Sequence, residues 1–385
     1  MQHNQRKLNA YIRGAYGPGN LGDDVLLEVC INILLKYFDE SKISVGLYNP
    51  KNPGYFSKYR CRFRHISAPA SADLLIYGGG GQFFEFKNSS STRSIIHKII
   101  NTSRHGLNRH DLAKILINKL LRRGNISFKK SASICLGLGP FENSESDSIK
   151  HKISPFLKCD YKSVRDIESF QISEKYVSGV KTYTDPTFLV NHWLGSRSIL
   201  RANKGNSIGV ILRRWDLSEH GRKAVLNTIE AARLLISSGI VVTLISLYSD
   251  YDKELISELN DFNWKIWDPN KQTPDIFIED IAKNFDILIS TRAHGVLLPA
   301  QTGVPSVVIG IEPKLKNIHK LLPNGTLYCD GDDPYEIFKL AKSCLHNRER
   351  LERQLKSDVE TQKIISEKFL DDFNSWLNLT IEKLQ

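Results

Sequence analysis

Residues 286–314 read DILISTRAHGVLLPAQTGVPSVVIGIEPK and carry the clearest structural pattern in the chain. The apolar runs at 287–290 and 306–309 are short and rich in Ile, Leu and Val, which is typical of buried strands. Residues 295–302 lie between them and favour a helix. A strand, a helix and a second strand in this order form a unit with parallel strands. The stretch therefore predicts a parallel α/β fold.

The same alternation extends toward the N-terminus. We expect further strands at 208–212, 241–246 and 264–266 and helices at 221–237, 250–259 and 275–284. Before residue 195 we expect strands at 8–13, 43–48, 73–77 and 133–138, short strands at 162–164 and 181–183, and a helix at 23–37. The polar segment 195–207 separates the two series and is typical of a linker.

Two series of strands and helices in 385 residues predict two domains. We expect Rossmann-like domains at 1–195 and 205–345, with parallel sheets facing a central cleft, and a helical C-terminal tail at 346–385. In open α/β sheets, ligands bind beyond the carboxyl ends of the strands. The loops that follow the strands are therefore the candidate functional sites.

The positive charge is concentrated in one segment. The formal net charge is +11, and residues 93–130 hold ten Lys and Arg against one acidic residue, Asp111. The rest of the chain is close to neutral, so we expect no nucleic-acid partner. Ile and Leu recur at helical spacing in 93–130, which predicts a basic helical insert. Two interpretations stay open: ordinary helices packed on the first domain, or a surface that docks on anionic membrane.

Several features favour a cytoplasmic protein, peripheral at the inner face of the membrane if the basic insert docks there. The six cysteines are scattered without a C-x-x-C pair, which argues against a disulfide framework or a zinc site. No apolar run approaches the roughly 20 residues that span a bilayer, and the first residues have no apolar signal-peptide core. We expect no metal and no cofactor. The oligomeric state is not indicated.

The loop GAYGPGNLGDD, at 14–24, follows the first predicted strand. It matches neither the P-loop nor the dinucleotide-binding fingerprint. The helix after it nevertheless directs free N–H groups at any bound anion. Asn20, Asp23 and Asp24 add polar side chains, and a purely structural turn is the alternative.

Four consecutive glycines at 78–81 follow the third predicted strand. Ordered glycine costs backbone entropy, and a structural turn needs only one or two glycines. We therefore expect Gly79 and Gly80 to contact phosphate or sugar.

Cationic side chains follow other strand ends. Arg292 and His294 are two residues apart, and in extended backbone such side chains point the same way, so both are expected to face the cleft. Lys314 follows the next strand, and Arg213 ends the first strand of the second domain. Arg165 lies in the segment SVRD, where a surface ion pair with the next residue is the alternative. Arg binds carboxylate or phosphate as a planar fork and Lys as a point charge, so the set predicts a site for a small polyanion.

These motifs, taken in order, resemble the polysaccharide pyruvyl transferase family. The resemblance rests on GAYGPGNLGDD, DLLIYGGGG, LGLGP, SVRD, TDPTFL, IGVILRR and STRAHGVLLPAQTGVPSVVI followed by a lysine. It extends from about residue 12 to residue 320. The family is similar in fold to two-domain glycosyltransferases of the GT-B type, and its members transfer pyruvate from phosphoenolpyruvate to glycans as ketals.

The resemblance implies that Arg165, Arg292 and His294 lie at a phosphoenolpyruvate site. Phosphoenolpyruvate would be the co-substrate, and a free, lipid-linked or polymeric saccharide the acceptor, in surface glycan biosynthesis. We expect His294 to be the general acid and the two arginines to clamp the anionic groups, with Arg213 and Lys314 assisting.

The candidate base for the sugar hydroxyl is Asp23 or Asp24.

Two other classes of function stay open. A nucleotide-sugar glycosyltransferase could share the architecture and use Glu312 to bind the ribose. A non-catalytic saccharide-binding protein could also have kept the fold, although the intact Arg-x-His pair argues against it. The sequence does not indicate which sugar accepts the group.

Overall fold

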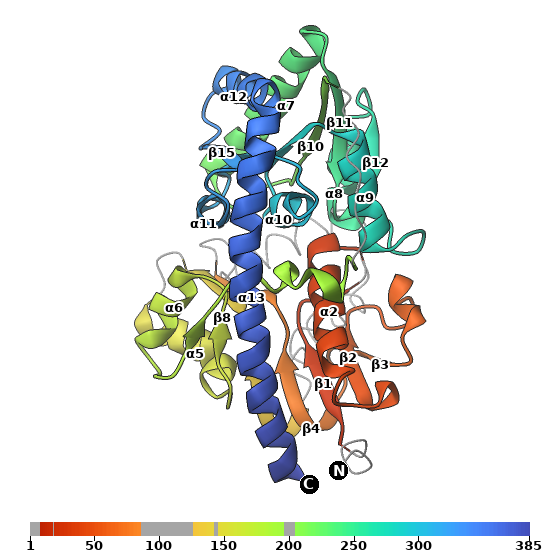
Figure 1. The fold of residues 1–385 in the computed structure, drawn as a ribbon, viewed down its shortest axis with the longest axis vertical. Helices are drawn as coiled ribbons and strands as arrows, with labels where there is room; N and C mark the ends of the chain where they lie inside the picture. Colours follow the sequence, from red (N-terminus) through yellow and green to blue (C-terminus); the bar gives the residue numbers. More distant parts are fainter. Residues whose placement is uncertain (1–7, 18, 86–125, 142–144, 196–204) are drawn as a thin grey trace, which may run out of the picture.

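The computed structural model describes residues 8–17, 19–85, 126–141, 145–195 and 205–385. They form two α/β lobes joined end to end, with one long helix lying along both (Figure 1). The expected fold class, two lobes with parallel sheets and a helical tail, is confirmed.

The first lobe contains two parallel sheets. The larger has the order β3-β2-β1-β4-β6, made of β1 (Ala10–Arg13), β2 (Ile43–Leu47), β3 (Arg62–His65), β4 (Ala70–Tyr77) and β6 (Ile126–Ser133). The smaller has the order β5-β7-β8-β9, made of β5 (Gly80–Glu85), β7 (Leu136–Phe141), β8 (Ser163–Val164) and β9 (Lys181–Thr182). Its helices are α2 (Leu21–Leu34), α5 (Ser146–Leu157) and α6 (Ile167–Glu174), with the 3-10 turns η3 (Pro186–Phe188) and η4 (Val190–His192).

The single strand expected at 133–138 was wrong, because the chain forms two strands there, in different sheets. Cys135 has a φ of 44°, in the left-handed region, and this residue separates β6 from β7. Gly80, with a φ of 102°, stands at the corresponding junction between β4 and β5. Both strand pairs therefore change sheets at the edge that faces the second lobe.

The C-terminal end of the basic insert was also placed wrongly, because residues 126–130 belong to β6. Lys129 pairs with Asp73 at 2.8 Å and Lys130 with Asp160 at 2.8 Å, so both lysines are held on the sheet. Residues 93–125 lie outside the described residues. Their helices and their docking on membrane stay predictions.

The second lobe has a six-stranded parallel sheet with the order β12-β11-β10-β13-β14-β15, which is the strand order of a Rossmann fold. The strands are β10 (Ser207–Ile211), β11 (Val241–Ser246), β12 (Trp264–Ile266), β13 (Ile287–Ser290), β14 (Ser306–Ile309) and β15 (Thr326–Cys329). The helices are α7 (Glu219–Ser237), α8 (Ser249–Glu258), α9 (Pro274–Asn284), α10 (His294–Ala300), α11 (Pro313–Leu321) and α12 (Pro334–His346).

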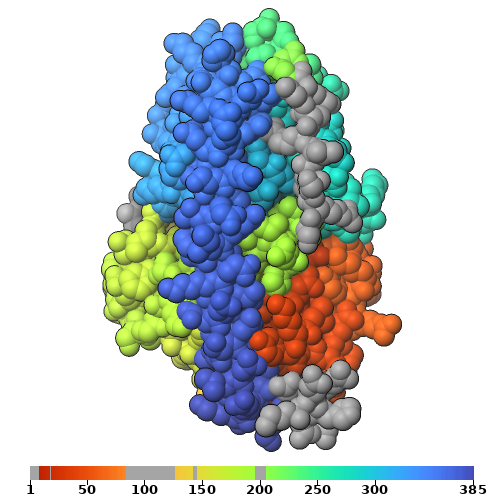
Figure 2. All heavy atoms as spheres, viewed as in Figure 1, coloured from red at the N-terminus to blue at the C-terminus, as the bar shows by residue number. Residues whose placement is uncertain are grey.

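The C-terminal tail is one helix, α13 (Arg348–Leu384), of 37 residues. At about 1.5 Å per residue it is roughly 55 Å long, and it covers one side of both lobes (Figures 1 and 2). Leu351 and Leu355 are buried in the core of the second lobe, and Phe369 and Phe373 in that of the first. The helix therefore ties the two lobes together.

Apolar packing also joins the lobes directly. One core cluster contains residues of α2 together with Trp267 and Phe277 of the second lobe, and both of these rings are fully buried. Among the described residues, no helix combines the length and the apolar character needed to cross a membrane.

Candidate functional site between the lobes

Four of the helices that follow strands carry or adjoin the candidate residues: α2 after β1, α6 after β8, α10 after β13 and α11 after β14. The ends of α2 and α10 approach each other at the boundary between the lobes (Figure 1). Loops that are far apart in the sequence are thereby brought to one place.

The ring of His294, the first residue of α10, packs against Gly22 of α2. A Cβ atom at Gly22 would lie 2.0 Å from Nδ1 of His294, so only glycine allows this contact. The side chain of His294 is 12% exposed, and its Nε2 is buried without a hydrogen-bond partner among the described residues. The described part of the protein therefore leaves the hydrogen-bonding capacity of this nitrogen unused.

Asp185, which is fully buried, lies at the centre of the site. Its Oδ2 is 3.7 Å from Nε2 of His294, which is too long for a hydrogen bond, and it accepts a 2.8 Å hydrogen bond from Nη1 of Arg165. The amide and hydroxyl of Thr187 donate to Oδ1. Burial alone would raise the pKa of Asp185, but the opposing effects of His294, Arg165 and Thr187 hold it far below its usual range. Asp185 is therefore a permanent anion facing the imidazole.

Arg165 reaches Asp185 across the strand β7. A Cβ atom at Gly137, in the LGLGP segment, would lie 2.6 Å from Nη2 of Arg165, so this glycine makes room for the guanidinium. Asp166, the next residue, accepts a 2.7 Å hydrogen bond from the amide of Ser169 and so caps α6. Arg165 is consequently a buried group of the site, and the surface ion pair considered from the sequence is not its main contact.

Asp23 completes the first lobe's part of the site. Nδ2 of Asn20 donates a 2.6 Å hydrogen bond to it, and Gly80 lies beside its other oxygen. Burial raises the pKa of Asp23, while His294 and then Lys314, Arg165 and Arg213 oppose the rise. Cations from both lobes therefore act on the carboxyl group of Asp23.

Lys314 and Arg213 supply the second lobe's cations. Burial, together with the neighbouring charges of Arg165 and Arg213, lowers the pKa of Lys314 to about 8, against weaker opposing effects of Glu312 and Asp185. Nη1 of Arg213 pairs with Glu312 at 3.1 Å. Burial is the largest cause of this low pKa, so an anion that pairs with Lys314 would favour its ammonium form.

The comparisons with known proteins bear on these same residues. The model of the polysaccharide pyruvyl transferase family matches residues 20–313, well over half of the chain. The chain belongs to this family. The matched range starts at Asn20, the N-cap of the helix α2 that carries Asp23, and ends one residue before Lys314, so it includes the other side chains of the site described above. A search of curated proteins gave no match.

Solved structures share the fold of this pyruvyl transferase family member at low sequence identity. Anabaena Alr3699/HepE in complex with UDP and glucose has a TM-score of 0.54 at 10% identity, over 96% of this chain and 98% of that one. The same protein in complex with UDP has a TM-score of 0.53 at 11% identity, over 96% and 100%. A putative UDP-N-acetylglucosamine 2-epimerase from Listeria monocytogenes has a TM-score of 0.54 at 10% identity, over 96% of each chain. These likenesses show the two-lobed GT-B architecture.

Arg292 does not face the cleft beside His294 as expected. Its Nη2 forms a buried ion pair with Asp252, and its Nε donates to the carbonyl of Leu212 at 3.1 Å. The expectation assumed extended backbone, but Ala293 is helical, with φ −56° and ψ −52°, so the flanking side chains diverge. Arg292 therefore holds the loop in front of α10 onto the second lobe.

Asp24 is also placed differently from its neighbour. It accepts hydrogen bonds of 3.1 Å from the amide of Gly19 and from the indole of Trp267. Burial raises its pKa well above the usual range. Of the two candidate bases, only Asp23 lies among the charged groups of the site, whereas Asp24 links the glycine-rich loop to the second lobe.

The four glycines at 78–81 divide into two pairs. A Cβ atom at Gly78 or Gly79 would meet the hydroxyl of Tyr16 at 2.0 Å or Leu26 at 2.8 Å, so protein side chains fill these approaches. Packing therefore accounts for glycine at both positions, and the contact of Gly79 with a ligand stays a prediction. Gly80 lies beside Asp23, and no atom lies within 4 Å of a Cβ atom at Gly81. Of the four glycines, only Gly81 faces open space.

Sequence reasoning underrated Asp185, did not connect Gly22 with His294 or Gly137 with Arg165, and missed Asp252. The segment TDPTFL contains Asp185, and its place in the family pattern was the available signal. The glycines and Asp252 give no local signal, because their contacts come from distant elements. Within the described parts of the chain, no group of His, Cys, Asp and Glu has the arrangement of a metal site.

Proposed function

We propose that this protein transfers the pyruvyl group of phosphoenolpyruvate to a saccharide as a cyclic ketal. One observation carries the proposal: the charges of Arg165 of the first lobe and of His294, Lys314 and Arg213 of the second all act on the buried carboxyl of Asp23 at the lobe boundary. A three-carbon compound with a carboxylate and a phosphate matches this set of cations.

The cations divide naturally between the two anionic groups. Arg165 is held by Asp185 and presents its remaining N–H groups in a fixed fork, which suits a planar carboxylate. Lys314 and Arg213 act on the phosphate and stabilise the charge that develops as it leaves. In this proposal Arg292 acts indirectly, by fixing the loop that precedes His294.

The imidazole of His294 is the acid that starts the reaction. Nε2 gives a proton to the methylene carbon of phosphoenolpyruvate, and positive charge develops at the adjacent carbon. The first sugar hydroxyl adds to that carbon, and Asp23 takes the hydroxyl proton. The carbon–oxygen bond to phosphate then breaks, the second hydroxyl closes the ring, and its proton leaves with the phosphate.

Asp185 and Asp23 fit these two tasks through opposite electrostatics. The ionised Asp185 lies 3.7 Å from Nε2 of His294 and holds Arg165 in place by an ion pair. Asp23 has a raised pKa, and a base whose pKa lies closer to the working pH exchanges protons more effectively.

The test replaces His294 with Gln and follows phosphate release from phosphoenolpyruvate in the presence of saccharides. We expect turnover to fall by about 10²–10⁴-fold. His192→Gln is the matched control, because His192 lies on η4 outside the site. Near wild-type turnover in His294→Gln would exclude the imidazole as the acid. Tight binding of a uridine or guanosine nucleotide without phosphate release would instead support a glycosyltransferase.

A further inference from the structure

A cavity opens beside the charged site, where the two lobes meet. Its volume is about 420 Å³, and its wall includes Glu168 of α6 from the first lobe. The second lobe contributes His220, Glu312, Asn317 and Lys320, among others. In Figure 1, α6 and α11 lie one above the other on this side of the molecule.

One wall of the cavity is a polar face of α11. Lys316, Asn317 and Lys320 line the cavity at a spacing of three and four residues, whereas Leu315 and Ile318 are buried in the core. The helix is therefore oriented by its apolar side, and its polar side is left for the cavity.

The opposite wall depends on Gly310. A Cβ atom there would lie 2.3 Å from the hydroxyl of Tyr328 and 3.2 Å from Asp330. Tyr328 donates a 2.5 Å hydrogen bond to Asp330, and Nε2 of His220 lies 2.9 Å from the carbonyl oxygen of Gly310. These contacts fix an aromatic ring, a carboxylate and an imidazole in the wall of the cavity.

Glu312 connects the cavity with the charged site. It lines the cavity, and its carboxylate pairs with Arg213 at 3.1 Å. Lys314 is two residues further along the chain. A molecule in the cavity would therefore lie next to the cations assigned above to phosphoenolpyruvate.

The lining contains both hydrogen-bond acceptors and hydrogen-bond donors. Glu168 and Asp330 accept hydrogen bonds, and Lys316 and Lys320 donate them. A hydroxyl group both donates and accepts, so a polyhydroxylated molecule can satisfy such a lining, whereas a simple anion would meet the carboxylates.

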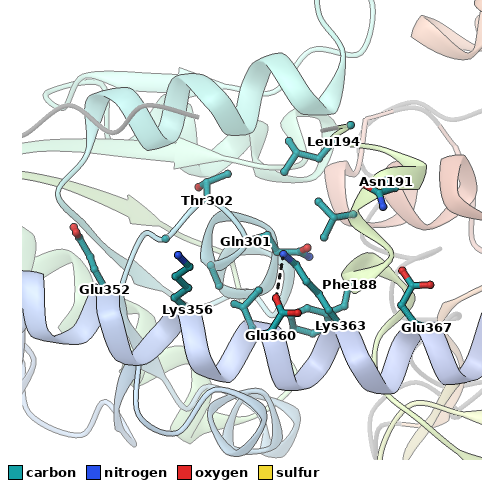
Figure 3. Close-up of a pocket in the computed structure, with 15 residues that line it drawn as sticks. Phe188, Asn191, Leu194, Gln301, Thr302, Glu352, Lys356, Glu360, Lys363 and Glu367 are labelled. Atoms are coloured by element: carbon teal, nitrogen blue, oxygen red, sulfur yellow. Dashed lines mark ion pairs between the residues drawn. The ribbon is translucent and has the colours of Figure 1, made fainter. Parts of the chain in front are cut away.

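Another large cavity, beside α13, does not offer the same access. It has a volume of about 490 Å³ and lies between η3–η4, the C-terminal end of α10 and the face of α13 that carries Lys356 and Lys363 (Figure 3). His294 stands at the other end of α10, roughly 10 Å away at about 1.5 Å per residue. A saccharide there would be separated from His294 by the length of α10.

We propose that the cavity lined by Glu168, Asn317, Lys320 and Asp330 binds the saccharide acceptor. This rests on the function proposed above and adds where the acceptor binds. Both lobes contribute to this subsite, so the acceptor and phosphoenolpyruvate meet at the lobe boundary with Glu312 between them.

The test uses p-nitrophenyl glycosides of galactose, glucose, mannose and N-acetylmannosamine as probes, each with a free 4,6-diol. Binding is measured by saturation-transfer NMR, and the affinity for phosphoenolpyruvate by calorimetry. We expect Asn317→Ala and Lys320→Ala to weaken glycoside binding about 5–100-fold, the equivalent of losing one or two hydrogen bonds. The affinity for phosphoenolpyruvate should stay within about twofold of wild type. Lys356→Ala, in the other cavity, is the matched control and should change neither.

Unchanged glycoside binding in the Asn317 and Lys320 variants overturns the proposal, as does a wild-type protein that binds none of the probes. A loss confined to the Lys356 variant moves the subsite to the other cavity and overturns it equally. If the wild type binds a glycoside through Asn317 and Lys320 but does not bind phosphoenolpyruvate, the saccharide subsite stands and the proposed donor is wrong.

Discussion

The lowered pKa of Lys314 leads to a measurable pH dependence of phosphoenolpyruvate binding. Burial and the positive charges of Arg165 and Arg213 lower this pKa to about 8. An anion that contacts the ammonium group binds its charged form, and the bound anion raises the pKa again. The affinity for phosphoenolpyruvate should therefore fall as the pH rises through 8.

The size of the effect follows from the charged fraction. With a pKa of about 8, Lys314 is about nine-tenths charged at pH 7 and about one-tenth charged at pH 9. If only the charged form binds, the dissociation constant at pH 9 is about ten times that at pH 7. The phosphate group has its second pKa near 6, so the ligand itself changes little over this range.

The assay is calorimetric titration with phosphoenolpyruvate between pH 7 and pH 9.5 for the wild type and two variants. Lys314→Gln should bind weakly at every pH, without the tenfold change. Lys314→Arg keeps its charge throughout, because the arginine pKa exceeds 12, and should also show a flat profile. A wild-type affinity that is constant from pH 7 to pH 9, or a Lys314→Gln variant that keeps the fall, would refute the reasoning.

Three further predictions test individual contacts. Gly22→Ala should abolish turnover, measured as phosphate release, because its Cβ atom would occupy the place of the imidazole of His294. Gly81 faces open space, so Gly81→Ala should keep wild-type turnover in the same assay. Asp185→Asn should lower the melting temperature and raise the KM for phosphoenolpyruvate at least about tenfold. The reason is that removing one partner of a buried ion pair costs about 3–5 kcal/mol. Melting curves and KM values equal to those of the wild type would contradict this. Arg292→Met should lower the free energy of unfolding, measured with a chemical denaturant, by a similar amount. Adding Asp252→Leu should restore most of that loss. A double variant as unstable as the single one would show that Arg292 does not stabilise the protein through its ion pair with Asp252.

The second lobe was predicted well from the sequence because its pattern is regular. The strands expected at 241–246, 264–266, 287–290 and 306–309 have the observed bounds. Buried parallel strands are continuous apolar runs, which leave little ambiguity. The first lobe was predicted less well. The edge strand β3 has the sequence RFRH, whose arginines and histidine are largely exposed, so it carries no such run.

Within the site, single motifs predicted which residues are near the lobe boundary and failed to predict where their side chains point. Asp23, Arg165, His294 and Lys314 are brought together as expected. Arg292 is not, because one helical residue, Ala293, redirects it toward a carboxylate of α8 that is forty positions away in the sequence. Orientation is decided by such long-range partners, and a single sequence does not reveal them.

The two buried carboxylates, Asp185 and Asp252, explain how one site can be both cationic and ordered. Each binds one arginine, Arg165 or Arg292, and so fixes a long flexible side chain that would otherwise lose entropy on binding substrate. Asp252 also neutralises its arginine inside the second lobe, so that charge does not add to the repulsion around Lys314. Asp185, by contrast, shares its negative charge between Arg165 and the imidazole of the general acid. Burial, together with the charges of Arg165 and Arg213, lowers the pKa of Lys314, and the arrival of a trianion reverses that shift, so substrate binding itself would charge this lysine.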